Sequence, residues 1–356
     1  MAGLVVILGA GASFDCTSSA IGEKNDGLRP PLVKDLFSST QSFAAILNEY
    51  PLAEMAAAEI RVTLANESVA LEDYLRTRLR DADDRYARLR YRQVPTYLQQ
   101  LFYEISRPAE GRQGVAGYTR QPDNYDALLN ETLALERVLF VTLNYDTILD
   151  QRLGQYEGGL FSLDSYVTAH RNWALFKLHG SVNWGREVYG LPIPTPPPSS
   201  IGTNEYLRLL QQVQNLDLGK ISFRLGGISD SRYDQRSGSL YYPALSAPLG
   251  AEDELSCPAD HVSTLKQQLH DLGELNVLVI GYSGLDKEML RLLPESAHGL
   301  KTLLVANGNS GASALAADTF SNLWSLGGFS EDSVFGGTFS ELISTGRLHE
   351  FVAKLT

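Results

Sequence analysis

The sequence has very few cysteines. Cys16 and Cys257 stand far apart among its 356 residues and form no Cys-x-x-Cys pair, so a zinc site built on four thiolates is excluded and we expect no metal. The sequence also lacks an apolar run of about 20 residues, which a membrane span needs. No basic segment precedes the apolar start at Leu4–Leu8, as it would in a signal peptide. We therefore expect a cytoplasmic protein without a membrane anchor.

Basic residues are also fewer than acidic ones. Lysine and arginine total 30 against 42 aspartates and glutamates, which gives a formal net charge of -12. An acidic protein repels phosphate backbones, so we expect no sequence-specific nucleic-acid binding. The segment from Arg76 to Arg92 is locally dense in charge of both signs. It suits either a solvated helix with internal ion pairs or a surface that docks a partner or a polynucleotide.

Five short apolar runs have the character of buried parallel strands. They are Leu4–Leu8, Val138–Leu143, Leu175–Leu178, Val277–Ile280 and Thr302–Val305. Each run leads into a loop rich in glycine or small polar residues. This pattern predicts an α/β fold with a doubly wound, mostly parallel, Rossmann-like sheet, in which ligands bind at the carboxyl ends of the strands.

The same pattern divides the chain. We expect residues 1–35 and 135–310 to form the nucleotide-binding domain, and residues 36–134 to form a helical insertion within it. Residues 190–240 are expected to be a second, loop-rich insertion, followed by a C-terminal segment from 311 to 356.

Apolar residues recur at helical spacing in several stretches. These stretches are 71–79, 94–105 and 262–272, with a weaker signal near 342–355. By contrast, the stretch from Arg224 to Arg236 is rich in Gly, Ser and Asp, which is typical of a mobile loop.

The first predicted strand runs into Gly9-Ala10-Gly11-Ala12-Ser13. Glycines allow the backbone to approach a pyrophosphate, and a following helix aims its first amides at the phosphate charge. An ordinary tight turn explains the same residues. Phe14 and Asp15 follow in place of the third glycine of a dehydrogenase fingerprint, and no Walker lysine is present. A plain dehydrogenase or P-loop ATPase is therefore a poor fit.

The next two predicted strands end in polar side chains. In Thr142-Leu143-Asn144-Tyr145-Asp146, Asn144 and Asp146 suit contacts to a ribose or to a water, although Asp146 equally suits capping of a helix over 147–153. In the segment after Leu175–Leu178, His179 precedes Gly180, so it is either a proton acceptor near neutral pH or a structural histidine.

The last two predicted strands open into similar loops. Gly281-Tyr282-Ser283 and Asp286 follow one strand, and Asn307 follows the other. Each side chain suits hydrogen bonds to a nucleotide, and each also suits turn formation.

Taken together, these five motifs resemble a sirtuin-type domain, specifically the bacterial sirtuin-like NAD hydrolases of anti-phage defence. The matching segments extend from residue 4 to about residue 307. The resemblance implies that Gly9–Ser13 holds the pyrophosphate of NAD and that Asn144 and Asp146 face the nicotinamide ribose and the attacking water. It implies that His179 is the general base. It assigns the remaining cofactor contacts to Gly180, Gly281, Tyr282, Ser283, Asp286 and Asn307.

The activity implied is hydrolysis of NAD, the substrate, to nicotinamide and ADP-ribose, so that NAD is depleted on infection. The missing zinc cysteines disfavour a protein deacylase. Such an activity needs control, and we expect a homo-oligomer or a separate partner such as a HerA-like ATPase. Residues 15–28 are interpreted as an extended loop, which is either a lid over the cofactor or a disordered excursion.

Two other functions stay open. The chain is alternatively a non-enzymatic subunit that binds NAD or ADP-ribose, or a structural subunit of a defence complex. Nuclease activity ranks low, because no acidic metal-binding cluster has convincing spacing.

Overall fold

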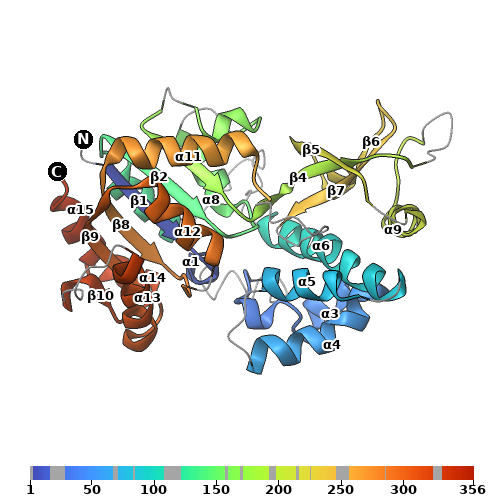
Figure 1. Cartoon of the computed structure of the whole chain (residues 1–356), viewed down its shortest axis with the longest axis horizontal. Helices are drawn as coiled ribbons and strands as arrows, with labels where there is room; N and C mark the ends of the chain where they lie inside the picture. Colours follow the sequence, from blue (N-terminus) through green and yellow to red (C-terminus); the bar gives the residue numbers. More distant parts are fainter. Residues whose placement is uncertain are drawn as a thin grey trace.

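The computed structural model describes residues 3–16, 29–66, 71–82, 85–107, 122–156, 159–168, 171–191, 198–213, 216–224, 226–245, 256–284, 286–323 and 331–356. Two sheets lie side by side within these residues. The parallel sheet is at the left of Figure 1 and a smaller antiparallel sheet is at the upper right, with a group of helices beneath it. The architecture is thus a mixed α/β fold with a Rossmann-like sheet.

The parallel sheet of the described chain has the strand order β10-β9-β8-β1-β2-β3. The bounds are β1 Gly3–Leu8, β2 Arg137–Thr142, β3 Trp173–Lys177, β8 Glu274–Ile280, β9 Gly299–Ala306 and β10 Val334–Phe335. The five predicted strands are confirmed. Strands β1 to β3 run outward on one side and β8 to β10 on the other, so the winding reverses between β1 and β8. In doubly wound sheets ligands bind at this reversal.

The central strands of the parallel sheet are buried on both faces because they are mainly apolar. On β1, Leu4, Val6 and Leu8 point into one core, Val5 and Ile7 into the other, and all five are fully buried. The first core is covered by α1 Ala10–Cys16, α7 Asn124–Thr132, α8 Ile148–Tyr156, α14 Phe339–Ser344 and α15 Arg347–Ala353. The second core is covered by α11 Ala259–Leu272, α12 Lys287–Ser296 and α13 Ser310–Leu323.

The antiparallel sheet has the strand order β5-β4-β7-β6. Its strands are β4 Gly180–Val188, β5 Leu218–Phe223, β6 Tyr233–Asp234 and β7 Ser239–Leu245. A third core joins it to the helical layer, by which we mean α3 Gln41–Leu47, α4 Pro51–Asn66, α5 Leu71–Arg80 and α6 Arg85–Ser106. The helices α9 Thr203–Gln212 and α10 Ile228–Arg232 pack at its edges. None of the helices in the described ranges combines the length and hydrophobicity that crossing a bilayer requires.

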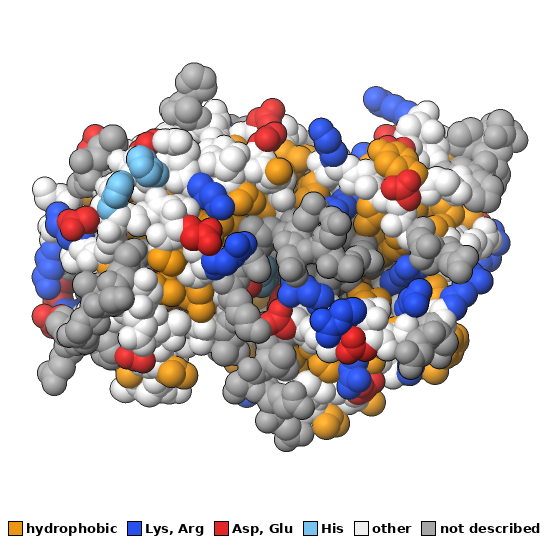
Figure 2. Space-filling model, in the orientation of Figure 1, with side chains coloured by type: hydrophobic (Ala, Val, Ile, Leu, Met, Phe, Trp, Pro, Cys, Tyr) orange, Lys and Arg blue, Asp and Glu red, His pale blue; other side chains and the backbone are white. Residues whose placement is uncertain are grey.

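The charged segment from Arg76 to Arg92 spans parts of α5 and α6. Arg76 pairs with Asp73 within α5, at 2.6 Å, whereas Arg78 pairs with Glu59 of the neighbouring α4. Lysines and arginines gather over the helical layer in the space-filling view, with acidic side chains between them (Figure 2). The internal ion pair fits the solvated-helix interpretation, and one face of each helix is buried in the third core.

Several expected boundaries need correction. Helix α7 lies within the predicted helical insertion, but its apolar side chains pack on the parallel sheet. The described part of 190–240 holds more regular structure than a loop-rich insertion, since it contributes α9, β5, α10 and β6. Residues 224–236 include α10 and β6, where Arg232 is 3% exposed and bonds Gln99 and Tyr50, so this stretch is anchored by packing. Most of the proposed lid, 17–28, lies outside the described residues.

Candidate functional site

A cavity of about 410 Å³ opens at the carboxyl ends of the parallel strands, across the point where the winding reverses. Its volume falls in the range of small-molecule sites. One wall, which we call the strand-end wall, is made by the loops after β1, β2, β3, β8 and β9. Its residues are Gly9, Ala10, Gly11, Ser13, Leu143, Asn144, Tyr145, Asp146, His179, Gly281, Tyr282, Ser283, Asp286 and Asn307.

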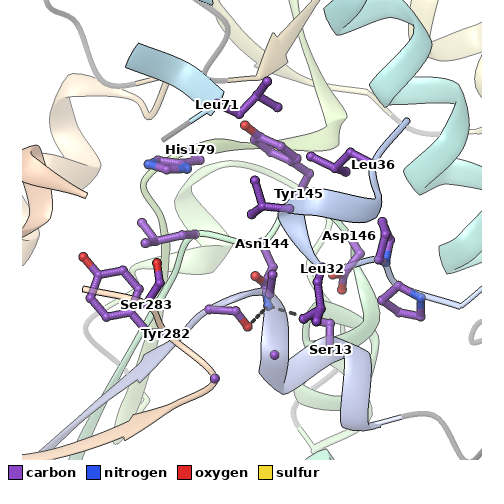
Figure 3. Close-up of a pocket in the computed structure, with 18 of the residues that line it drawn as sticks. Ser13, Leu32, Leu36, Leu71, Asn144, Tyr145, Asp146, His179, Tyr282 and Ser283 are labelled. Atoms are coloured by element: carbon purple, nitrogen blue, oxygen red, sulfur yellow. Dashed lines mark hydrogen bonds between the residues drawn. The ribbon is translucent and has the colours of Figure 1, made fainter. Parts of the chain in front are cut away.

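The opposite wall, the helical wall, comes from residues 30–36 and from α4, α5 and α6. Its residues are Pro30, Pro31, Leu32, Val33, Lys34, Leu36, Leu64, Leu71, Glu72 and Phe102. Tyr282 and Ser283 lie on one side of the cavity and Leu32 and Leu36 on the other, with Asn144 between them (Figure 3). The cavity therefore joins a polar surface to a mainly apolar one.

All the predicted site residues line this cavity except Ala12 and Gly180. Ala12 is fully buried, on the side of α1 that faces the core. Gly180 begins β4 with φ +84, and an added Cβ would collide with the Ala244 carbonyl oxygen of β7. This glycine lets the chain pass from one sheet to the other, and the structure gives it a packing role outside the cavity lining.

The glycines of the first motif are required by the approach of two loops. A Cβ on Gly9 would lie 2.5 Å from the Gly281 oxygen, and one on Gly11 would lie 2.7 Å from the Gly281 Cα. The Gly11 amide donates to the Gly281 oxygen at 3.0 Å, and the Ala12 amide donates to the Gly9 oxygen at 2.9 Å. These two amides already have acceptors, so a phosphate would depend on other donors of the loop.

Asn144 ties the ends of β1 and β2 together. Its Nδ2 donates to the Gly9 oxygen at 2.9 Å and to Ser13 Oγ at 3.0 Å, the bonds dashed in Figure 3. Ser13 Oγ in turn shares a hydrogen bond with Tyr125 Oη at 2.9 Å. Because Asn144 is 8% exposed, these contacts fix its side chain at the floor of the cavity.

Asp146 lies two residues before α8 and lines the cavity. Its Oδ1 accepts from the Ile148 amide at 3.1 Å, which agrees with the capping interpretation. Burial raises the pKa of its carboxyl, although the ammonium of Lys177 opposes that effect. Lys177 is itself buried, where it donates to the Asp146 carbonyl and pairs with Asp150 at 3.0 Å.

His179 lies in the short link between β3 and β4, with a carboxylate at each ring nitrogen. Its Nε2 is 2.7 Å from Asp286 Oδ2, and its Nδ1 is 3.2 Å from Glu72 Oε1. Burial lowers the pKa of the ring, but the two carboxylates outweigh it and raise the pKa to about 10. The histidine is therefore an imidazolium at neutral pH, which is the wrong state for a general base.

The other loops are held by similar internal bonds. Asp286 Oδ1 caps α12 by accepting from the Met289 amide at 2.6 Å, and Tyr282 Oη accepts from the Asp286 amide at 3.0 Å. Asn307 Nδ2 donates to the Tyr282 oxygen at 2.9 Å. Ser283 is exposed at the rim. Hydrogen bonds thus link Tyr282, Asp286 and Asn307 along one edge of the cavity.

Glu72, which lines the cavity and contacts His179, is a charged side chain that sequence reasoning missed. It is the second residue of α5, more than a hundred residues from His179, and no local motif marks it. Tyr145, part of a recognised motif, reaches it through Oη at 2.5 Å. Among the described residues, no group of three or more His, Cys, Asp or Glu side chains is arranged to hold a metal ion.

The sequence matches no protein-family model, and no curated protein is significantly similar to it. The resemblance to sirtuin-like NAD hydrolases therefore rests on the five sequence motifs alone.

Proposed function

We propose that this chain binds NAD in the cavity and hydrolyses it to nicotinamide and ADP-ribose. One observation carries the proposal. Residues from five separate strand ends line a single cavity at the point where the winding of the doubly wound sheet reverses. Their sequence motifs indicate that these residues are suited to binding a nucleotide. The polar strand-end wall suits the ribose and phosphate groups, and the apolar helical wall suits a flat ring.

The reaction breaks the bond between nicotinamide and ribose, and nicotinamide leaves as a neutral base. Positive charge develops on the sugar carbon, to which a water adds before losing a proton. Negative side chains facing that carbon stabilise the charge. Glu72, His179 and Asp286 together carry one net negative charge when the ring is protonated, and Asp146 adds another.

A proton acceptor must take the proton of the water. We assign this role to Asp146, because burial raises the pKa of its carboxyl toward that of an effective base. His179 is already protonated, so in this proposal it contributes charge and orientation. Asn144 holds the floor of the cavity against which the ribose would lie.

A second candidate is a subunit that binds NAD or ADP-ribose without cleaving it. The internal bonds of Gly11, Asn144 and His179 favour it, since each of these groups is satisfied without a ligand. A protein deacylase stays disfavoured by the two isolated, buried cysteines. Within the main proposal, the cellular role is NAD depletion in the cytoplasm during anti-phage defence, controlled by homo-oligomerisation or by a HerA-like ATPase.

The test follows nicotinamide and ADP-ribose release from NAD by the purified chain, alone and with candidate activators. Asp146→Asn and His179→Gln should reduce cleavage at least tenfold. His261→Gln is the matched control, because His261 is also buried but bonds Leu163 of another loop. Stabilisation by NAD without product would favour the binding subunit. Absence of both cleavage and stabilisation would reject the proposal.

A further inference from the structure

The ring of His179 bridges two parts of the fold, through a hydrogen bond with Asp286 at 2.7 Å and an ion-pair contact with Glu72 at 3.2 Å. Asp286 belongs to the loop between β8 and α12, whereas Glu72 belongs to the helical layer. Ionised carboxylates only accept hydrogen bonds, and one lies 2.7 Å from Nε2 and another 3.2 Å from Nδ1. This geometry favours a ring that carries a proton on each nitrogen.

The surroundings of His179 offer few other groups that titrate. The Tyr145 ring packs against it with centroids 6.2 Å apart, and its hydroxyl donates to Glu72 rather than to the histidine. Tyr282 contacts Asp286 through the Asp286 amide. The described charged groups that face the imidazole are thus the two carboxylates.

Glu72 is itself held in place. Burial would raise the pKa of its carboxyl, but His179 and the hydrogen bonds from the ring and from Tyr145 outweigh burial and lower the pKa. Phe102 of α6 packs edge-on against Tyr145 with centroids 5.4 Å apart, which fixes the tyrosine between the helical layer and the sheet. The carboxylate therefore stays charged and in one position.

We propose that Glu72 is a positioning residue of this site, which reaches from the helical layer to orient the ring of His179 and to set its protonation state. This role deepens the proposed function, and its catalytic consequence rests on that function. With Glu72 in place the three-residue bridge keeps a net negative charge toward the ribose. Without it, the ring loses one acceptor and releases its proton at lower pH.

The test is a pH titration of the histidine rings by NMR, with the His179 signals assigned from a His179→Gln spectrum. In the wild type, both nitrogens of His179 should carry protons at pH 8. In Glu72→Gln the titration midpoint should fall by about 1–3 pH units, the usual effect of one adjacent opposite charge. Asp73→Asn is the control, because it removes a carboxylate from the same helical turn at a residue paired with Arg76.

A wild-type ring with one bare nitrogen at pH 8 would overturn the proposal, and this measurement needs no variant to fold. An equal shift in Glu72→Gln and Asp73→Asn would also overturn it, since the effect would then be general to the helix. Among folded variants, a smaller shift of the titration midpoint in Glu72→Asp than in Glu72→Gln would support it. Aspartate keeps the negative charge but holds it farther from the ring, because its side chain is one methylene shorter.

The cleavage assay separates this proposal from the proposed function. If the chain hydrolyses NAD, Glu72→Gln should lower kcat about tenfold with little change in KM, and the pH profile of kcat should move with the ring titration. A chain that shows the NMR shift without cleaving NAD keeps the positioning role and loses the proposed activity. A chain that cleaves NAD, but in which Glu72→Gln leaves the titration midpoint of His179 unchanged, keeps the proposed activity and loses the positioning role.

Discussion

The two walls of the cavity are built in different ways. The strand-end wall rests on backbone loops that approach so closely that Gly9, Gly11 and Gly281 leave no space for a Cβ atom. The helical wall is made of side chains such as Leu32, Leu71 and Phe102, and Glu72 bonds across the cavity to the other wall.

This difference predicts different responses to substitution. A backbone contact cannot relax without moving two strands, whereas a side-chain wall can repack or change its outline. The strand-end wall should therefore govern stability, and the helical wall should govern the fit of the ligand and the charge state of the histidine. Four substitutions or conditions test this contrast.

The largest effect should come from Gly281→Ala. Gly281 has φ +63, and an added Cβ would collide with the Ala12 amide nitrogen. We expect a loss of about 3 kcal/mol or more in the free energy of unfolding, measured by chemical denaturation. Gly346→Ala is the control, because Gly346 has φ +75 but open space around it, and it should lose about 1 kcal/mol. Equal losses of unfolding free energy in the two variants would mean that the close approach of the loops at Gly281 does not affect stability.

The next effect concerns pH. Burial lowers the pKa of His179, but Glu72 and Asp286 raise it overall from 6.5 to about 10. The folded chain thus binds this proton more tightly than the unfolded chain. The resulting stabilisation is complete below pH 6.5 and disappears as the pH rises to 10. We expect the free energy of unfolding to fall by about 2 kcal/mol between pH 7 and pH 9. A His179→Gln chain with the same slope would contradict this.

Asn144→Ala should cost somewhat less. It leaves the Gly9 oxygen and Ser13 Oγ without the donor that joins β1 to β2. We expect a loss of about 1–2 kcal/mol in unfolding free energy, since two buried groups each lose one of their two hydrogen-bond partners. Asn130→Ala, at an exposed asparagine bonded to Tyr156, should change it by less than about 0.5 kcal/mol. If the two variants match, Asn144 has no structural role.

The smallest effect on stability should come from Val33→Ala in the helical wall. Val33 is 43% exposed and lines the cavity, so truncation should change the unfolding free energy by less than about 0.5 kcal/mol. Binding of NAD should weaken severalfold, as measured by calorimetry, because apolar contact area is lost. Val62→Ala is the matched control, since Val62 is 62% exposed and lies outside the cavity lining. Equal affinities in the two variants would exclude the helical wall from the site.

Most of the strand-end wall was predictable from the sequence. A run such as Leu4–Leu8 has one stable place, a strand buried on both faces, and parallel strands bring their carboxyl ends to one edge. The exception is Gly180, which has a packing role. Gly180 looks like a ligand contact, yet its positive φ serves the passage between two sheets.

The helical wall was not predictable in the same way. Helical spacing marks Leu71 and Leu75 as apolar positions, but it does not say against which surface they pack. Residues 224–236 show the same limit, because their polar composition indicated a loop while the buried contacts of Arg232 formed α10. Those contacts lie far apart in sequence, so no local pattern contains them.

The sequence by itself determined the parallel sheet and the chemistry offered at its carboxyl edge, because apolar runs and the polar residues that end them are local properties. Only the tertiary structure decided the protonation and the hydrogen-bond partners of those polar residues. It brought Glu72 to His179 and made the histidine a cation, and it gave Asn144 internal partners. A pKa and a hydrogen bond depend on neighbours within a few ångströms, and folding alone chooses those neighbours.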